Sequence, residues 1–304
     1  MKKVTILIPI HNRLEITKEG LSSLYKALYY YNEYGKGSIL YSIIVIDDGS
    51  TDGSKDYIAE VYKDIYLLKG DGHLWWTGCI NLGARFAIYE IQSDYLLLWN
   101  DDIFPNQNYF LIIESLIYDI RFINTVIGSK IIFKNSPEKI WSVGGYFNKF
   151  SGNFGMKNKI KDNKKKIINC QWQPGMGTLI PVNVITSYGI IWDEKNFPQY
   201  HGDSDFTLQC STKGIQIITY LDLIISNNTE TTGFSRKTNL NDLYESFTSI
   251  KSGYNVEVDL KFYLKHGYLP FAFWGMFIKY FTFTGGYIKH SIFKRPVEKM
   301  LSEV

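Results

Sequence analysis

The stretch SIIVIDDGSTDG at residues 42–53 decides the fold class. Its first half is an apolar run, which is typical of a strand buried on both faces of a parallel sheet. The run ends abruptly in Asp47 and Asp48, and Gly49 then permits a tight turn. Ligands of such sheets bind beyond the carboxyl ends of the strands. The segment therefore predicts an α/β fold with a polar site at this strand end.

Further apolar runs lie on both sides of this strand, and segments with helical periodicity separate them. They predict strands at residues 4–8, 65–68 and 95–99, and helices at about 14–31, 57–62 and 77–91. Repeated strand–helix units favour a mostly parallel central sheet flanked by helices. Polar residues follow these strands at 9–13, 71–76 and 100–102, where a site is expected.

The second half of the chain is less regular. It predicts strands at 178–182 and 215–220 and a helix that begins near Gly202. Toward the C-terminus the composition becomes helical and aromatic. We therefore expect a catalytic domain at residues 1–238 and a C-terminal helical aromatic extension at residues 239–304.

The charge balance excludes one class of function. The chain carries 33 lysines and arginines against 30 aspartates and glutamates, so it has no strong basic field for nucleic-acid binding. Cys79, Cys170 and Cys210 are too widely spaced for a disulfide framework or a CxxC metal clip, and they fit a reducing compartment. The basic start precedes only a short apolar run without a cleavage site, so we expect a cytoplasmic protein.

Asp47 and Asp48 suit a hydrogen bond to a base or a ribose. The same residue types form Asx turns and helix N-caps, and this alternative stays open. Residues 48–53 also resemble the start of a calcium-binding EF-hand loop. Ala59 stands where that loop needs a bidentate glutamate, and a strand precedes the segment, so we exclude calcium.

Asn100, Asp101 and Asp102 follow a buried strand that ends in Trp99. Clustered carboxylates at a strand end suit a hard divalent cation, Mg²⁺ or Mn²⁺, whose shell is completed by phosphate oxygens and water. Such a cation would neutralise a leaving diphosphate. The alternative is a polar loop that caps the helix after Pro105.

Asp203 and Asp205 stand one residue apart at the start of the helix predicted near Gly202. A carboxylate that faces a sugar hydroxyl can act as a general base when the hydroxyl oxygen attacks. Acidic residues in a first helical turn also interact favourably with the helix dipole, so a structural role is the alternative.

Six stretches resemble, in this order, the motifs of family 2 glycosyltransferases, which have the GT-A fold. The resemblance covers about residues 3–220. It includes the Asn-x-Asp form of the metal motif that is common among rhamnosyltransferase-like members. None of the stretches is specific alone, whereas together they are. They are VTILIPIHNR at 4–13, IVIDDGSTDGS at 44–54, GCINLG at 78–83, LLWNDD at 97–102, GMGTLI at 175–180 and the segment 189–206.

The resemblance implies a donor side of the site. Asp48 would contact the base or ribose of a nucleotide-diphosphate sugar, with a dTDP or UDP sugar favoured. Asp102 would hold Mn²⁺ or Mg²⁺. Trp75 and Trp76 would stack on a base or a sugar ring, with core packing as the alternative. The residues implied on the nucleotide side, besides Asp48, are Pro9, His11, Arg13, Trp75, Trp76, Asn81 and Asp101.

The resemblance also implies an inverting reaction. Asp203 would take the proton of an acceptor hydroxyl, and Asp205 would support it or touch the acceptor. The residues implied on the acceptor side are Gly177, Thr178 and His201.

Three positions depart from the family's pattern. Gly202 replaces a glutamate before the base, and Ile80 replaces an arginine near the phosphates. Asn227 or Asn228 replaces a histidine that can bind the metal. Metal coordination would therefore rest on Asp102 and the nucleotide.

Residues 268–288 are rich in aromatic and aliphatic side chains but contain Pro270, Lys279 and a glycine pair. The internal lysine and the glycines make this segment a poor membrane-spanning helix. It suits an interfacial helix on an anionic cytoplasmic leaflet because basic residues flank it. A helix packed on the core or in a homodimer contact is the alternative. The flanking residues are Lys261, Lys265, Lys289, Lys294 and Arg295.

Together with this segment, the resemblance to family 2 glycosyltransferases implies an enzyme of bacterial surface-polysaccharide synthesis, such as O-antigen or capsule, at the cytoplasmic face of the inner membrane. Its acceptor would be a glycan or a polyprenyl-linked oligosaccharide. Two alternatives stay open. A nucleotidyltransferase needs a phosphate loop rich in Gly, Arg and Lys, and residues 9–13 offer only Arg13. A catalytically inactive sugar-nucleotide-binding or scaffold protein rests only on the departures at Gly202 and at Asn227 or Asn228.

Overall fold

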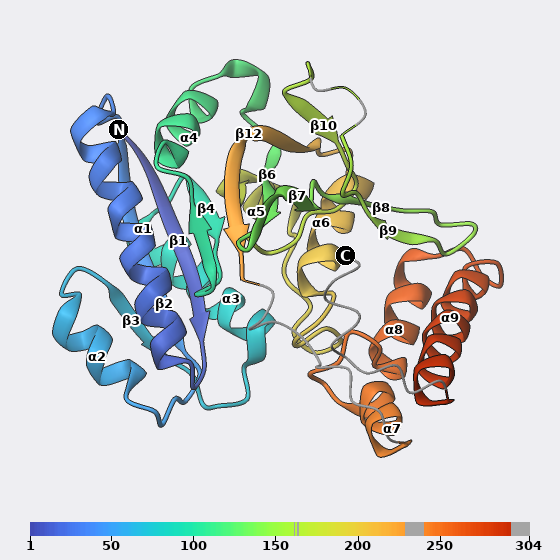
Figure 1. Cartoon of the computed structure of the whole chain (residues 1–304). Helices are drawn as coiled ribbons and strands as arrows, with labels where there is room; N and C mark the ends of the chain where they lie inside the picture. Colours follow the sequence, from blue (N-terminus) through green and yellow to red (C-terminus); the bar gives the residue numbers. More distant parts are fainter. Residues whose placement is uncertain (161, 163, 229–239, 293–304) are drawn as a thin grey trace. The chain divides into compact units, whose positions relative to one another are not determined.

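The computed structural model describes residues 1–160, 162, 164–228 and 240–292 (Figure 1). The chain divides into two compact units. The first holds Met1–Tyr146 and continues from Gly155 through the last strand of the sheet. The second holds the hairpin tip Phe147–Phe154 and the helices described beyond residue 239.

The first half of the sheet is parallel. β1 (Lys2–Ile10), β2 (Ile39–Asp47), β3 (Tyr66–Lys69) and β4 (Tyr95–Leu98) lie in the order β4-β1-β2-β3. Ile10 pairs with Asp47, and Leu7 pairs with Leu98. The central strands of this half are buried on both faces, which is why their sequences are nearly continuous apolar runs. The carboxyl ends of β1, β2 and β4 therefore meet at one edge.

The second half of the sheet is mixed. β11 (Thr178–Pro181) is antiparallel to β4 and to β6 (Val126–Phe133), and β12 (Ile217–Asn227) runs parallel to β6. Because β11 runs opposite to β4, its first residue pairs with Leu98, the last residue of β4. The loop before β11 thus reaches the same edge as the carboxyl ends. The strands at the margins are β5 (Ile103–Pro105), β7 (Ser136–Ser142) and β10 (Ile167–Asn169).

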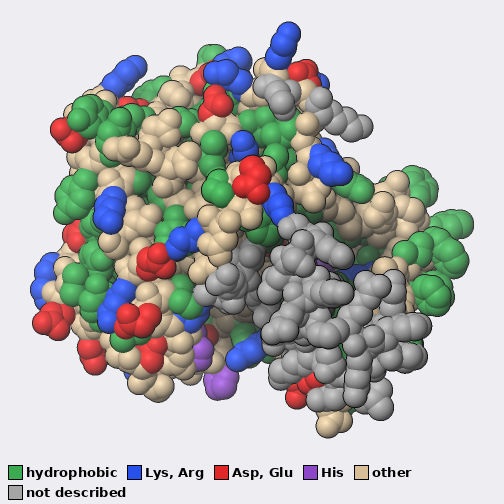
Figure 2. Space-filling view, in the orientation of Figure 1, with side chains coloured by type: hydrophobic (Ala, Val, Ile, Leu, Met, Phe, Trp, Pro, Cys, Tyr) green, Lys and Arg blue, Asp and Glu red, His purple; other side chains and the backbone are tan. Residues whose placement is uncertain are grey.

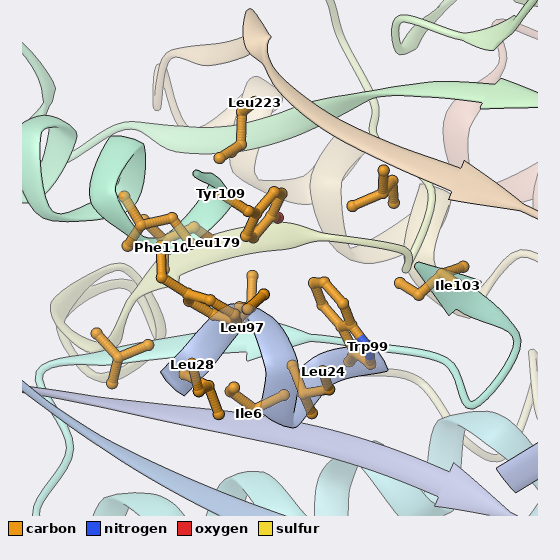
Figure 3. Packing of buried hydrophobic residues seen from close by; sticks show 14 of the residues in the cluster. Ile6, Leu24, Leu28, Leu97, Trp99, Ile103, Tyr109, Phe110, Leu179 and Leu223 are labelled. Carbon is orange, nitrogen blue, oxygen red and sulfur yellow. The ribbon is translucent and has the colours of Figure 1, made fainter. Parts of the chain in front are cut away.

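Helices cover both faces of the sheet. Figure 3 shows Trp99 among Leu24, Ile103 and Tyr109 on one face, and its ring meets that of Tyr109 edge-on. This face is covered by α1 (Leu14–Tyr34), α2 (Ser54–Val61) and α4 (Tyr109–Ile117), which a 3₁₀ turn, Ile120–Phe122, follows. The other face is covered by α3 (Trp75–Phe86), α5 (Val182–Tyr188) and α6 (Gly202–Thr212).

The predicted elements agree with the structure in type and place, and several of them extend beyond their predicted bounds. The helix predicted at 77–91 begins at Trp75 and ends in a π-helical turn, Ala87–Ile91, before Gln92 adopts φ 59°. The strand predicted at 215–220 continues to Asn227, because its last residues pair with β6 and β5 after a bulge. The chain after β12 thus lies beside Asp102, whose carbonyl oxygen accepts the Asn228 N–H at 3.3 Å.

The second unit is built around aromatic side chains. A hairpin of β8 (Gly145–Phe147) and β9 (Phe154–Met156) carries its tip into this unit, where Phe147 meets Phe262 and Tyr263 edge-on. The predicted boundary at residues 238 and 239 lies outside the described residues, and no sequence signal assigns the hairpin tip to the second unit. The helices of this unit are α7 (Leu240–Thr248), α8 (Val256–His266) and α9 (Phe273–Ile292).

Lys279, the charged residue within the aromatic segment, points into this unit. Its Nζ donates to Asp259 Oδ2 at 2.5 Å and to the Gly253 carbonyl at 2.8 Å. Tyr280 OH donates to the same Asp259 oxygen at 2.7 Å. Lys279 and Tyr280 of α9 therefore face α8. Among the described helices, none combines the length and the hydropathy that crossing a membrane requires.

Glu114 of α4 is a buried carboxylate that ties α1 to β2. Tyr31 OH, Ser38 Oγ and the backbone N–H groups of Lys36 and Ser38 donate to it at 2.5–3.0 Å. Burial acts to raise the pKa of Glu114, but these hydrogen bonds outweigh it and lower the pKa to about 2.

We expect Glu114→Gln to lower the free energy of unfolding at neutral pH by about 1–3 kcal/mol, because an amide replaces a carboxylate that accepts several hydrogen bonds. The folded pKa lies below the ordinary 4.5, so the stabilisation is complete above about pH 4.5 and is lost as the pH falls toward 2. Urea unfolding at neutral and acid pH measures both effects, with the exposed Glu33→Gln as control. If Glu114→Gln lowers the free energy of unfolding by the same amount at both pH values, this account is contradicted.

Candidate active site

The polar residues predicted to form the site meet at one edge of the sheet. Residues 9–13 overlap the end of β1, Asp47 and Asp48 lie at the end of β2, and residues 100–102 follow β4. The loop 174–177 joins them because β11 is antiparallel. Within this edge, Pro9 pairs with Ile46 in the sheet, and His11 Nδ1 lies 2.6 Å from the Asp48 carbonyl oxygen.

Asp48 organises the loop that follows β3. Its Oδ1 accepts the N–H groups of Gly72 and Leu74 at 2.8 and 3.3 Å, and its Oδ2 accepts the N–H of Trp75 at 2.9 Å. Asp48 is buried, and Trp75 adopts φ 55°. The carboxylate therefore fixes the path of residues 71–75 through long-range contacts, which differ from the local Asx turn or helix N-cap left open above. Its contact with a base or ribose stays a prediction.

Asp101 and Asp102 form a buried carboxylate pair that Arg13 bridges. Arg13 Nη1 lies 3.0 Å from Asp101 Oδ1, and Nη2 lies 2.8 Å from Asp102 Oδ2. Thr17 Oγ1 donates to Asp101 Oδ2 at 3.0 Å. Burial raises the pKa of Asp101 to about 6, while the positive charge of Arg13 acts in the opposite direction. α1 can approach this closely only at Gly20, where a Cβ would lie 2.0 Å from the Asp101 carbonyl oxygen.

Trp76 connects this carboxylate pair with the loop before β11. Its indole Nε1 donates to Asn100 Oδ1 at 3.1 Å, and its backbone N–H donates to Gln199 Oε1 at 3.2 Å. The ring packs so closely on Gly175 that a Cβ there would lie 2.1 Å from Trp76 Cζ2. The side chain is half-buried, so part of the indole stays accessible at the site.

Asp203 lies in the first turn of α6 beside the same loop. The Gly175 N–H donates to Asp203 Oδ2 at 2.8 Å, and the Ser204 N–H donates to Oδ1 at 2.6 Å. Burial raises the pKa of Asp203, although these two hydrogen bonds act to lower it. A carboxylate with a raised pKa accepts a proton more readily near neutral pH. These surroundings suit the general base predicted at this position.

Asp205 and His201 have different surroundings from Asp203. Asp205 is fully buried, and Gln209 Nε2 donates to its Oδ2 at 2.9 Å. His201 precedes α6 with φ 67°, and its Nδ1 lies 3.3 Å from Ser204 Oγ. Both residues thus help to shape the start of α6. Their roles toward the base and the acceptor stay predictions.

Gly177 and Thr178 hold the loop 174–177 in place. Thr178 is buried, and its Oγ1 donates to the Pro174 carbonyl at 2.7 Å. Gly177 adopts φ 64°, and its carbonyl accepts Ser129 Oγ at 2.6 Å. Their contact with an acceptor stays a prediction.

Asn81 braces a segment before α6. Its Nδ2 donates to the Trp192 carbonyl and to Glu194 Oε2, both at 2.8 Å. The Asn81 side chain therefore fixes residues 192–194, and its predicted contact on the nucleotide side stays a prediction.

Sequence reasoning missed three polar residues of the site. Thr17 donates to the carboxylate pair, and Gln199 accepts the N–H of Trp76. Gln173 Nε2 donates to the Ile218 carbonyl at 3.0 Å and so anchors the loop 174–177 to β12. Each is a single residue outside any motif, so neither spacing nor pattern indicated them.

The carboxylate pair suits a cation. In the part of the chain that the structure describes, no three His, Cys, Asp or Glu side chains cluster as a metal-ligand group. Asn100 Oδ1 accepts the Trp76 indole, which leaves Asp101 and Asp102 as the oxygen donors. Mg²⁺ and Mn²⁺ commonly bind through one or two carboxylates together with phosphate oxygens. The guanidinium of Arg13 already stands against both carboxylates, which shows that a positive charge fits there.

A comparison with models of protein families identifies the family of this chain. A model described as Glycosyl transferase family 2 matches residues 5–183, which is more than half of the chain. The chain belongs to glycosyltransferase family 2. This confirms the family that the motifs predicted, whereas the rhamnosyltransferase-like branch stays a prediction. A search of curated proteins found no match to this glycosyltransferase.

Solved structures share the fold of this glycosyltransferase at low identity, and the predicted GT-A fold is confirmed. Residues 1–349 of S. aureus TarS in complex with UDP-GlcNAc are 17% identical, with a TM-score of 0.54 over 81% of this chain and 64% of that one. A second S. aureus TarS structure is 14% identical, with a TM-score of 0.55 over 88% of this chain and 43% of that one. The structure of GalNAc-T7 with UDP, GalNAc and Mn²⁺ is 14% identical, with a TM-score of 0.55 over 75% of this chain and 44% of that one. The chain spans less than two thirds of each.

Proposed function

We propose that this glycosyltransferase moves a sugar from a nucleotide-diphosphate sugar to a hydroxyl group of a glycan or polyprenyl-linked acceptor, with inversion at the anomeric carbon. The main support is a chain of contacts that joins the candidate base to the carboxylate pair. Asp203 accepts the Gly175 N–H, Gly175 packs on Trp76, and Trp76 donates to Asn100, next to Asp101. These contacts support a proton acceptor and a cation-binding position within one site.

In this reaction the acceptor hydroxyl lies against Asp203. Asp203 takes the hydroxyl proton as the oxygen forms its bond to the anomeric carbon, and the bond from that carbon to the diphosphate oxygen breaks. The main requirement is correct placement of the two reactants. The departing diphosphate gains negative charge, and Arg13 at the carboxylate pair is a positive group within the site.

The donor side consists of residues 9–13 and the loop that Asp48 holds. We infer a UDP or dTDP sugar, and the UDP-containing structures of the same fold favour UDP. Mn²⁺ or Mg²⁺ held by Asp102 would supply Lewis-acid stabilisation of the diphosphate. We assign Trp76 to the sugar rather than to the base, because it contacts Asn100 and Gly175.

A thermal-shift panel tests the donor class. UDP, GDP, dTDP and CMP are each added with Mn²⁺, Mg²⁺ or EDTA, because a ligand that binds only the folded protein raises its melting temperature. We expect a selective shift with UDP or dTDP that is larger with either metal than with EDTA. Nucleotide release from the corresponding sugars, with and without acceptor, then tests transfer. A protein that no nucleotide stabilises would contradict the proposal and favour the inactive scaffold.

The second unit carries an exposed apolar surface that we call the aromatic stripe. Its side chains recur at helical spacing along one face of α9, and the stacked rings of Trp274, Phe277 and Phe281 have centroids 5.5 and 5.9 Å apart. Because Lys279 and Tyr280 point inward, the helix presents an apolar face to solvent. The stripe consists of Trp274, Phe277, Ile278, Phe281 and Ile288.

The stripe adjoins an apolar groove of about 940 Å³ that includes Phe150, Pro270 and Phe271. Figure 2 shows hydrophobic side chains gathered over this part of the second unit. Exposed apolar patches of this kind mark interaction surfaces, and aromatic helix faces insert into membrane interfaces. We infer that the stripe contacts an anionic membrane, the surface that holds a polyprenyl-linked acceptor. Lys289, Lys294 and Arg295 are predicted to flank the aromatic segment, and their side chains lie outside the part of the chain that the structure describes.

We expect the triple variant Trp274→Gln, Phe277→Gln, Phe281→Gln to reduce binding to anionic liposomes by at least about tenfold, since three large apolar side chains leave the interface. Cosedimentation with vesicles that contain phosphatidylglycerol measures it. A matched control replaces Tyr29, Tyr89 and Tyr118, which are exposed aromatic residues of the first unit. The wild-type protein could instead fail to bind liposomes and form a dimer that the triple variant does not form. In that case the partner of the stripe would be a second copy of the chain and not a membrane.

A further inference from the structure

Arg13 lies where the proposed function places a metal ion, and this suggests how the site behaves without a donor. Nη1 and Nη2 of Arg13 contact Asp101 and Asp102 at 3.0 and 2.8 Å. We propose that Arg13 is a resident cation that keeps a divalent metal ion off Asp102 until the donor diphosphate arrives. The inference rests on the proposed donor class and adds an order of binding, in which the metal does not bind first.

Both carboxylates need a positive partner. The side chains of Asp101 and Asp102 are only 2% and 1% exposed, and a buried carboxylate without a cation carries a large desolvation cost. Thr17 contributes a neutral hydrogen bond to Asp101 alone. Arg13 stays charged throughout the physiological range, and its planar fork reaches both aspartates at once. Without Arg13, two adjacent buried negative charges would attract a metal ion directly.

The Arg13 side chain is the part of this arrangement that can move. It is 29% exposed, whereas the carboxylates belong to short side chains on a buried turn. The backbone before it is fixed, because the Asn12 N–H donates to Ser50 Oγ at 2.9 Å and Asn12 Oδ1 accepts the Thr51 N–H at 2.7 Å. The flexible stem lets the guanidinium leave the carboxylates while the loop keeps its position.

A bound diphosphate offers Arg13 another partner. A guanidinium binds phosphate oxygens as well as carboxylate oxygens. When Arg13 turns to the diphosphate, Asp102 Oδ2 becomes available to a metal ion that the same diphosphate helps to hold. Without nucleotide, a divalent ion at Asp102 would lie next to the positive charge of Arg13, and the two would repel. Metal and donor therefore strengthen each other's binding.

Electron paramagnetic resonance of Mn²⁺ tests the proposal on the full chain, since it separates free from bound metal without any sugar transfer. For the wild type we expect Mn²⁺ binding to be at least about tenfold tighter with UDP than without it. For Arg13→Met we expect binding without UDP to be at least about tenfold tighter than in the wild type, with little further gain from UDP.

Two variants keep the test decisive. Arg13→Lys retains one charge that cannot bridge both carboxylates, so it gives an intermediate Mn²⁺ affinity and replaces Arg13→Met if that variant does not fold. Arg85→Met removes an exposed arginine of α3 and should match the wild type. A Mn²⁺ affinity of the folded Arg13 variants within twofold of wild type, without UDP, would overturn the proposal. If neither the wild type nor the variants bind UDP, the proposed donor class is wrong. The Mn²⁺ affinities measured without nucleotide still test the role of Arg13.

Discussion

Asp203→Asn is expected to lower kcat for sugar transfer by about 10²–10⁴-fold and to leave nucleotide affinity nearly unchanged. The amide has the size of the carboxylate, and its oxygen can still accept the Gly175 N–H that lies 2.8 Å from Asp203 Oδ2. It cannot take a proton from an acceptor hydroxyl. The loss should therefore appear in kcat rather than in the KM for the donor.

The rate of nucleotide release at saturating donor, with acceptor present, measures this loss. Asp222→Asn is the matched control because Asp222 is an exposed aspartate of β12 that pairs with Lys166. A kcat for Asp203→Asn within tenfold of the wild type would remove Asp203 from the role of base. It would leave the family assignment unaffected, because that rests on residues 5–183.

The pH dependence gives a second measurement of the same role. Burial raises the pKa of Asp203 above its ordinary value of 3.8. The base acts in its deprotonated form, so kcat/KM should rise with pH through this raised pKa and then level off. The rising limb should disappear in Asp203→Asn. A limb that persists in the variant would belong to another group.

The sequence was sufficient to predict the strand-end motifs because each is local. Asp48 and the segment 100–102 follow buried apolar runs, and parallel strands bring their carboxyl ends to one edge. The place of Gly175 depends instead on the direction of β11. A strand of four apolar or small residues, Thr178–Pro181, does not reveal whether it runs parallel or antiparallel. The contact of Gly175 with Asp203 was therefore beyond sequence reasoning.

Partners of individual side chains were also beyond it. Arg13 was predicted to line the nucleotide pocket, and the structure pairs it with carboxylates far along the chain. Lys279 was predicted to disfavour a membrane-spanning helix, but the sequence did not indicate its partner Asp259, which lies on another helix. Such contacts depend on tertiary packing, which local patterns do not encode. The contact of Lys279 with Asp259 on α8 is what leaves the aromatic stripe as the outer face of α9.

Trp76→Ala is expected to lower kcat/KM for sugar transfer by about 10²-fold. The variant removes the ring that packs on Gly175, and Gly175 donates the hydrogen bond that positions Asp203. It also removes the donor to Asn100 beside the carboxylate pair. A displacement of a reacting group by about 1 Å is enough for a loss of this size. Thermal melting of the variant checks that the loss does not reflect unfolding.

Trp76→Phe separates the two contributions of the indole. It keeps an aromatic ring against Gly175 but cannot donate to Asn100, so we expect a loss of less than about tenfold. The thermal shift with UDP then decides which part of the donor Trp76 contacts. If Trp76→Ala keeps the UDP shift and loses transfer, the indole acts at the sugar, because the nucleotide binds at the loop that Asp48 holds. If the UDP shift disappears as well, Trp76 belongs to the nucleotide side, where the sequence prediction also placed it.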